Sequence, residues 1–390
     1  VTMCTSQSQA LLLSRPVRTA VPAVNQKLAL GTHQENGQRE VPVLRQTPNR
    51  KLRVLVVDDS AEARGVIIQG LAASPRIEVV GYAVNAMYAE TKLQHLSPDV
   101  MTLDVEMPGI NGIDCLKQFL PSHPLPVILV SSLNLRVFDA LAAGAVDFVR
   151  KPDAVESRES FLQALTHKII VASHARLSRA NLPHPAAPAA PLRFGGDGAP
   201  EQTVIGLGAS TGGTEATLNV LRRLPANIPG MVIVQHMPVG FTKMYAERLN
   251  RLCQMEVREA VNGDEIRPGL ALVAPADYQA KVVRMGPRYT LSCIPGEKVS
   301  GHRPSVDVLF SSMAASVRCR MVGIIMTGMG RDGASGLLEM RKAGAYTIGQ
   351  DKDSCVVYGM PMVAHDIGAV TVQASCDNIA SVLMNHLNNR

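Results

Sequence analysis

The chain has 390 residues, a length that corresponds to about two or three domains or one large one. A hydrophobic content of 46% against 18% charged residues excludes a wholly disordered chain, and no apolar run approaches the roughly 18 residues that a membrane-spanning helix needs. The net charge of +6 includes no Lys/Arg block of the nucleic-acid-binding type, and Trp is absent, so surfaces for stacking bases are few.

The N-terminal segment, residues 1–50, has no sustained apolar period, and we expect a disordered extension there. The short apolar run at 10–13 has no basic residue before it, so we expect no secretory signal. The seven cysteines are scattered without a CxxC pair, which is typical of reduced thiols in a cytoplasmic protein and argues against a zinc site.

Residues 51–171 alternate short apolar runs with segments of helical character. Such alternation predicts an α/β domain built on a doubly wound parallel sheet, because strands buried on both faces are apolar throughout. The five runs that we expect to be strands are 53–57, 77–81, 100–103, 127–130 and 146–149.

A Pro/Ala-rich stretch and a Gly-rich stretch follow, and we interpret residues 172–201 as a linker. From there the alternation resumes, which predicts a second doubly wound α/β domain over residues 202–390. Its expected strands are 204–208, 231–235, 270–274, 321–326 and 345–349.

Polar residues follow four of the expected strands in the first domain: Asp58 and Asp59, Asp104, Ser131, and Lys151. Ligands bind beyond the carboxyl ends of the strands in open α/β sheets, so we expect these groups to lie together. Three carboxylates at one edge repel one another unless a cation lies among them, and oxygen ligands favour Mg²⁺. The pattern indicates phosphoryl transfer to Asp104; the alternative is that each acid caps the following helix.

The second domain begins with a strand that turns through glycines at 206–213. A dinucleotide-binding loop is one interpretation, but it requires an acid at the end of the next strand, where His236 stands. The segment GASTG at 208–212 fits a nucleophile elbow that presents Ser210. His236 would act as its base, and Asp332, after a third strand, would orient His236.

The chain order Ser, His, Asp differs from that of the α/β-hydrolases and disfavours that fold. Other candidate residues have simpler interpretations. His302 lies in an expected polar loop. His365 lies in an expected helix. The acids that we expect at the surface or at helix caps are Asp307, Asp351 and Asp366.

Three segments of the first domain are VVDDS at 56–60, DVEMP at 104–108 and GAVDFVRKP at 144–152. They resemble the response-regulator receiver family, which implies a flavodoxin-like fold. The resemblance implies that a histidine kinase phosphorylates Asp104, and that Ser131 and Lys151 sense the phosphoryl group. The Mg²⁺ ligands that it implies are Asp58, Asp59, Asp104 and the carbonyl oxygen of Glu106.

Five segments of the second domain are GASTGGTEA at 208–216, QHMP at 235–238, HRPSVDVLF at 302–310, TGMGRDGA at 327–334 and CVVYGMP at 355–361. They resemble the effector domain of the chemotaxis methylesterases, which implies a Rossmann-like, three-layer α/β esterase domain. Together the two resemblances cover about residues 51–390. They imply that Ser210 is the nucleophile, His236 the base and Asp332 its partner, and that the backbone N–H of Met329 binds the oxyanion.

The chain departs from these families at two places. The segment between Ser131 and Gly144 is shorter by about four residues, close to one helical turn, in a region that normally moves on phosphorylation. The family usually has Gly and His where Ala276 and Gln279 stand, beside the expected site.

The resemblance implies a cytoplasmic enzyme, controlled by phosphorylation, that hydrolyses glutamate γ-methyl esters on chemoreceptors and deamidates receptor glutamines. Its implied partners are methylated chemoreceptors and a chemotaxis histidine kinase. We expect Mg²⁺ in the receiver domain and no cofactor in the catalytic domain. The alternatives are a non-catalytic signalling adaptor that binds receptor or kinase, and an effector of this fold in another pathway.

Overall fold

The structure, a computed structural model, describes residues 50–107, 112–132, 135–152, 157–177, 192–195 and 203–389. The expected N-terminal extension therefore lies outside the described residues, apart from Arg50. Most of the expected linker also lies outside them. Every helix, strand and contact named for this protein lies within the described residues.

The first domain contains five parallel strands in the order β2-β1-β3-β4-β5. All residues of β3 and β4 are buried, which explains why these strands are apolar except at Thr102, Asp104 and Ser131. This arrangement confirms the predicted doubly wound sheet. The strands are β1 (Leu52–Val57), β2 (Ile77–Ala83), β3 (Val100–Asp104), β4 (Val127–Ser131) and β5 (Asp147–Arg150).

Helices cover both faces of this sheet. Two helices, α1 (Ala61–Ala72) and α5 (Arg158–Ala172), bury Ile67 and Phe161 against one face. The other face is covered by α2 (Ala86–Leu96), α3 (Gly112–Phe119) and α4 (Arg136–Ala142). The shortened region that the sequence indicates contains α4, which has only seven residues.

The second domain has a seven-stranded parallel sheet in the order β15-β14-β13-β6-β7-β10-β8. It includes all five predicted strands, so the predicted doubly wound parallel sheet is confirmed here as well. The strands are β6 (Thr203–Ala209), β7 (Met231–Gln235), β8 (Glu256–Glu259), β10 (Leu270–Val273), β13 (Arg320–Ile325), β14 (Tyr346–Gln350) and β15 (Val372–Ala374).

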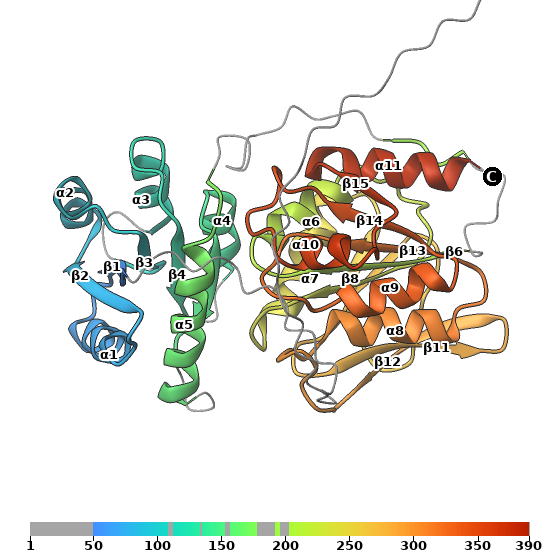
Figure 1. Cartoon of the computed structure of the whole chain (residues 1–390), viewed down its shortest axis with the longest axis horizontal. Helices are drawn as coiled ribbons and strands as arrows, with labels where there is room; N and C mark the ends of the chain where they lie inside the picture. The colour runs from blue at the N-terminus through green and yellow to red at the C-terminus, as the bar shows by residue number, and fades with distance from the viewer. Residues whose placement is uncertain are drawn as a thin grey trace, which may run out of the picture. The chain divides into compact units, whose positions relative to one another are not determined.

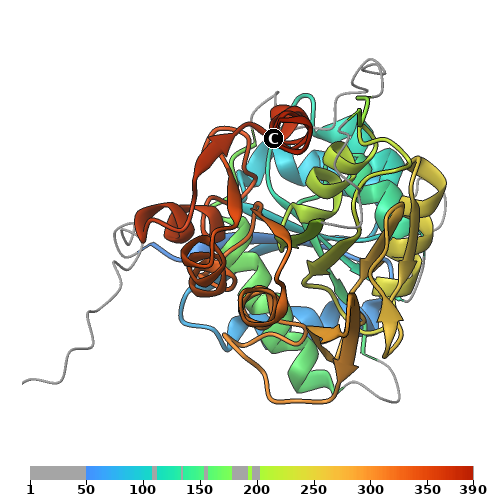
Figure 2. The ribbon, with the colours of Figure 1, turned by 90° about the vertical axis from the view of Figure 1, so that its right-hand side faces the viewer.

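Two layers of helices enclose the seven-stranded sheet (Figures 1 and 2). On one face lie α6 (Gly213–Leu221), α7 (Phe241–Leu252) and α11 (Cys376–Asn388). On the other lie α8 (Val306–Ser316), α9 (Ala334–Lys342) and α10 (Met360–Asp366). The three layers position the loops that follow the strands at one edge of the sheet.

A small antiparallel sheet lies outside the predicted strands. It consists of β9 (Asp264–Glu265), β11 (Gln279–Met285) and β12 (Arg288–Ile294), in the order β11-β12-β9. Helix α8 packs against β11. The loop between β12 and α8 carries His302 and Ser305, so this sheet fixes one side of the site described below.

The described residues from Arg50 onward belong to one compact unit, and the two domains share an apolar contact. The Phe138 ring of α4 stacks on the Tyr245 ring of α7 at 5.8 Å between centroids and meets Phe241 edge-on at 6.4 Å. Within the ranges given above, no helix combines the length and hydrophobicity needed to cross a membrane.

Candidate functional site

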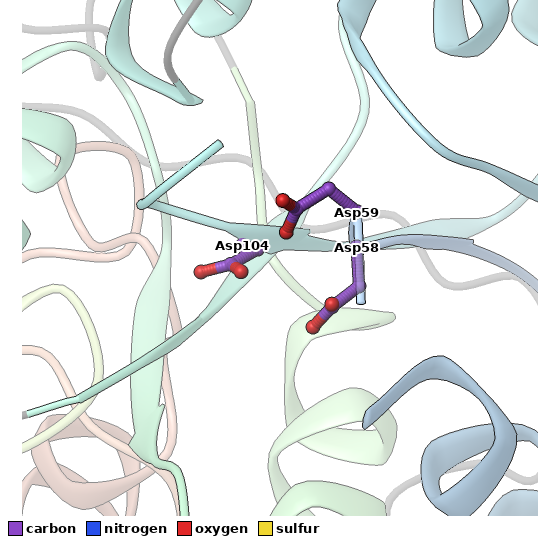
Figure 3. Close-up of side chains that lie close together, drawn as sticks. All are labelled: Asp58, Asp59 and Asp104. Carbon is purple, nitrogen blue, oxygen red and sulfur yellow. The ribbon is translucent and has the colours of Figure 1, made fainter. Parts of the chain in front are cut away.

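The first candidate site is a cluster of carboxylates at the carboxyl edge of the first sheet (Figure 3). Asp58 and Asp59 follow β1 and Asp104 ends the neighbouring strand β3, so the sheet brings them together. One oxygen of each lies within 4.8 Å of the others. Ser60, rather than either acid, caps α1, which disfavours the capping interpretation of Asp58 and Asp59.

Lys151 completes this cluster. Its Nζ lies 2.6 Å from Asp104 Oδ2 and 3.1 Å from Asp58 Oδ2, and both aspartates are almost fully buried. Burial raises the pKa of Asp104 above its usual value in spite of the hydrogen bonds from Lys151 and the Glu106 N–H. Burial alone would lower the pKa of Lys151, but its contacts with Asp104 and Asp58 raise it. One lysine thus faces an excess of carboxylate, and hard oxygen ligands of this kind fit a divalent cation.

The structure also brings Ser131 and Glu106 to this edge. Ser131 ends β4, beside β3, and its Oγ is buried without a hydrogen-bond partner among the described residues. The Glu106 N–H donates to Asp104 Oδ1 at 3.0 Å, which places Glu106 next to the cluster. An unpaired buried hydroxyl is costly, so Ser131 fits a position that an additional acceptor would satisfy.

The second candidate site begins at the turn after β6. Ser210 leaves the strand, its N–H donates to the Thr327 carbonyl at 3.0 Å, and Gly213 N–H donates back to the Ser210 carbonyl at 2.7 Å. Gly212 has φ +76°, a left-handed conformation that glycine adopts at little cost. A Cβ on Gly328 would lie 2.7 Å from the Ser210 Cβ, so this close approach also requires glycine.

His236 leaves the neighbouring strand beside Ser210. The register pairs Ala209 of β6 with Gln235 of β7, and His236 N–H donates to the Ala209 carbonyl at 3.2 Å. His236 Nε2 lies 2.9 Å from Asp332 Oδ2. An ionised carboxylate only accepts, so the ring proton lies on Nε2, and Nδ1 keeps a free lone pair. That Nδ1 is buried and has no hydrogen-bond partner among the described residues.

Asp332 lies on the loop after β13 and is 1% exposed. It accepts hydrogen bonds from Ser305 Oγ at 2.6 Å, from Val306 N–H at 2.8 Å and from Asp307 N–H at 3.1 Å. The carboxylate therefore sits at the N-terminus of α8, where the helix dipole favours negative charge. Burial alone would raise its pKa, but the hydrogen bonds from His236, Ser305 and Val306 hold the pKa below its usual range.

Strand order explains how these three residues come to lie at one edge of the sheet. β6 lies between β7 and β13, so Ser210, His236 and the loop that carries Asp332 leave three adjacent strands at one edge. Ser210 and His236 line one cavity of about 740 Å³, together with Met329. The Met329 N–H donates no hydrogen bond within the described part of the chain, so it remains available to an acceptor.

His302 is the residue that sequence reasoning left out of the site. The expectation of a loop is correct, but the loop turns into the cavity, and the His302 ring stacks on the His236 ring at 3.7 Å between centroids. No strand end marks His302 in the sequence. The available signal is indirect: His302 stands three residues before Ser305, which binds Asp332. Asp307 lies in the first turn of α8 and accepts a hydrogen bond from the Gly336 N–H near the start of α9.

The fold and the two sites define a class of protein with two domains. One domain carries a receiver-type acidic site, and the other carries a serine, a histidine and an aspartate of the kind found in serine hydrolases. Two family models agree with it: "Response regulator receiver domain" matches residues 54–162 and "CheB methylesterase" matches residues 205–383. The chain belongs to the family of protein-glutamate methylesterases/protein-glutamine glutaminases.

The relatives that support this membership match over almost their whole length. The chain is 50% identical over 341 residues to protein-glutamate methylesterase/protein-glutamine glutaminase 2 of Syntrophomonas wolfei, covering 87% of this chain and 98% of that protein. It is 47% identical over 349 residues to the protein-glutamate methylesterase/protein-glutamine glutaminase of Syntrophotalea carbinolica. That match covers 87% of this chain and 99% of that protein. Among solved structures, the Thermotoga maritima CheB methylesterase catalytic domain is 32% identical, with a TM-score of 0.46 over 47% of this chain and 97% of that one.

Proposed function

We propose that this chain is a phosphorylation-controlled serine esterase that hydrolyses glutamate γ-methyl esters on chemoreceptors. The names of its relatives support this activity, and they support the deamidation of receptor glutamines by the same site. We assign residues 51–171 to the receiver domain, 172–201 to the linker and 202–390 to the catalytic domain. Chemoreceptors are the proposed substrate and a chemotaxis histidine kinase the proposed phosphodonor, and both would meet the enzyme in the cytoplasm.

The observation that carries the proposal is the His236–Asp332 pair beside Ser210. A serine hydroxyl is a weak nucleophile near neutral pH and needs an adjacent base. The 2.9 Å contact with Asp332 holds the His236 proton on Nε2, which leaves the buried, unpartnered Nδ1 to accept the Ser210 proton. In enzymes without bound substrate, the hydrogen bond between the nucleophile and its base is often long, and it shortens only when substrate binds.

In the first half-reaction, Ser210 Oγ attacks the γ-carbonyl carbon of the methylated glutamate, and His236 Nδ1 takes the hydroxyl proton. The imidazolium is stabilised by the Asp332 carboxylate, which the hydrogen bonds at the start of α8 keep ionised. His236 then gives the proton to the leaving methoxy group, the ester C–O bond breaks, and methanol departs. The product is an acyl-enzyme on Ser210.

The tetrahedral intermediate carries a negative charge on the former carbonyl oxygen. The Met329 N–H, which lines the cavity and has no partner among the described residues, is the proposed donor to that oxygen. The turn after Ser210 leads into α6, whose N-terminus favours negative charge as well. Loss of one oxyanion donor typically lowers the rate by about 10²–10³-fold.

In the second half-reaction a water molecule replaces the alcohol. His236 Nδ1 takes a proton from the water, the hydroxide attacks the acyl carbon, and the proton returns to Ser210 Oγ as the glutamate is released. For a receptor glutamine the sequence is the same, except that the leaving group is ammonia. Neither route consumes an oxidant, a reductant or a cofactor.

We assign the receiver site to phosphoryl transfer from the kinase to Asp104. Asp58, Asp59 and Asp104, with the Glu106 carbonyl, are the residues that would hold Mg²⁺, which neutralises phosphate charge when bound. Lys151 Nζ, already 2.6 Å from Asp104, would pair with the phosphoryl group. The unpartnered Ser131 hydroxyl would donate a hydrogen bond to it.

We further propose that the unphosphorylated receiver domain covers the serine site. The cavity that contains Ser210 and His236 is also lined by Arg150 of β5 and by several residues of α5. Arg150 directly precedes Lys151, so a shift of Lys151 toward a phosphoryl group would also move β5 at the rim of the cavity. Phosphorylation would thereby shift an existing equilibrium between closed and open forms.

A methanol-release assay on membranes that contain methylated receptors tests the proposed function. The full chain should release methanol, and a small phosphodonor such as acetyl phosphate should increase the rate. If the chain releases no methanol with or without the phosphodonor, the proposed function is wrong. If it releases methanol at a rate that the phosphodonor does not change, the esterase assignment stands and the control by the receiver fails.

A further inference from the structure

The imidazole of His302 lies flat against the imidazole of His236. The ring centroids are 3.7 Å apart and the ring planes differ by 6°. His302 belongs to the loop between β12 and α8, and both histidines line the cavity of Ser210. The triad mechanism assigns no role to His302, so this contact requires its own explanation.

Hydrogen bonds with Val299 and Gln279 hold the His302 loop in place. The N–H and carbonyl of His302 pair with the backbone of Val299, and Gln279 Nε2 donates to the carbonyls of His302 at 3.2 Å and Glu297 at 2.8 Å. Gln279 is 4% exposed, and its Oε1 accepts from Ser305 N–H at 3.0 Å. One side chain therefore fixes both the stacked histidine and the serine that donates to Asp332.

The bond to Asp332 alone does not fix the His236 ring. Nε2 lies closer than Nδ1 to the Cβ–Cγ axis about which the imidazole rotates. A hydrogen bond at Nε2 therefore restrains this rotation less than a hydrogen bond at Nδ1 would, and a given rotation moves Nδ1 farther than Nε2. A parallel ring packed against one face blocks that rotation, because any tilt of His236 would collide with His302.

His302 is also suited to lie beside a histidine that becomes charged. Burial and the neighbouring His236 lower the pKa of His302 to about 3, so His302 stays neutral at physiological pH. The face of a neutral aromatic ring attracts a cation, whereas a protonated His302 would repel one. The stack therefore stabilises the imidazolium that forms on His236 when it takes the Ser210 proton.

We propose that His302 is a positioning residue for ester hydrolysis: its ring face, stacked on His236, keeps Nδ1 directed at Ser210 and supports the charged form. The inference rests on the proposed function. It also gives a role to Gln279, where the family usually has histidine, since Gln279 holds the carbonyl of His302 in place.

The experiment measures methanol release by the full chain with a saturating phosphodonor and compares three substitutions. His302→Ala removes the ring and should lower kcat by about tenfold or more, while KM stays within about twofold. His302→Phe keeps a neutral ring face and should retain kcat within about threefold of the wild type. The matched control is His365→Ala, which removes a half-exposed histidine of α10 that does not line the cavity of Ser210. This substitution should leave both kcat and KM unchanged.

Each result decides the inference. It is overturned if His302→Ala keeps kcat within about twofold of the wild type, or if His302→Phe is as slow as His302→Ala, since the ring face would then not be the cause. A wild-type chain without methanol release overturns the proposed function itself, and the inference falls with it. If circular dichroism shows that His302→Ala does not fold, His302→Gln takes its place, because glutamine fills the space without a ring face. The same loss of kcat is expected for His302→Gln, and the same outcomes would overturn the inference.

Discussion

Thr211, the residue directly after Ser210, donates a hydrogen bond of 2.6 Å from Oγ1 to the carboxylate of Asp147 in the receiver domain. Both side chains are buried, at 5% and 7% exposure. The same carboxylate also contacts Lys168 Nζ at 2.6 Å. A charged group of one domain is thus bonded to the turn that presents the nucleophile of the other, which makes this pair a direct link between the receiver and the serine site.

Asp147→Asn is expected to raise the basal esterase rate by about fivefold in the absence of phosphodonor. Hydrogen bonds to charged groups contribute about 1.5–3 kcal/mol and neutral ones about 0.5–1.5 kcal/mol, so the substitution weakens the closed form by about 1 kcal/mol. A change of that size alters a two-state population about fivefold. Methanol release should be measured with and without phosphodonor, and the stimulated rate should stay close to that of the wild type.

The matched control is Asp139→Asn, which removes an exposed carboxylate from α4 of the same domain. It should change neither the basal nor the stimulated rate. A basal rate for Asp147→Asn equal to that of the control would show that the bond to Thr211 does not hold the closed form.

Asp104→Asn is expected to abolish the stimulation of methanol release by a phosphodonor. The amide oxygen cannot accept a phosphoryl group, and the substitution also removes the charge that pairs with Lys151 at 2.6 Å. The ratio of the rates with and without acetyl phosphate should fall to unity. Asp139→Asn should keep the wild-type ratio. Stimulation that persists in Asp104→Asn would mean that another residue accepts the phosphoryl group.

Ser210→Ala is expected to abolish both methanol release and labelling by a serine-directed fluorophosphonate. The probe reacts with a serine whose proton is removed by a neighbouring base, a role that the unpartnered Nδ1 of His236 can fill. Mass spectrometry of the labelled wild-type chain should place the adduct on Ser210. A wild-type chain that resists the probe would instead agree with a non-catalytic adaptor.

The sequence predicts the two parallel sheets well because their strands are buried on both faces. Strands such as β3, β4 and β7 are short and mostly apolar, and burial along their whole length is the physical cause of that pattern. The runs do not reveal β8 (Glu256–Glu259), a mostly polar edge strand, or β15 (Val372–Ala374), which has only three residues.

The antiparallel sheet has a different signal. In β12 (Arg288–Ile294) buried residues alternate with exposed or half-buried ones, as expected for a sheet with one face on the core. A search for apolar runs misses such a strand, whereas a search for alternation finds it. This sheet matters for function, because the loop that follows β12 carries His302 and Ser305.

The candidate site was predictable where its residues end strands. Ser210 and His236 follow neighbouring strands, and the acidic cluster of the receiver follows β1 and β3, so adjacency in the sheet implies adjacency in space. His302 and Gln279 were not predictable in this way. Their positions depend on side-chain to backbone hydrogen bonds across a loop, which leave no periodic pattern in the sequence.

Asp332→Asn is expected to lower kcat by about 10³–10⁴-fold, because an amide no longer fixes the proton of His236 on Nε2. The same substitution predicts a change in stability with pH. The pKa of Asp332 is lowered in the folded chain, so its carboxylate stabilises the fold above the unfolded value of about 3.9, and that contribution is lost as pH falls through the folded pKa. The Tm of the wild type, from calorimetry of the full chain, should exceed that of Asp332→Asn at pH 7, and the difference should shrink below about pH 4. A Tm difference that stays constant from pH 7 into this acidic range would mean that the hydrogen bonds from Ser305 and Val306 do not depend on the charge of Asp332.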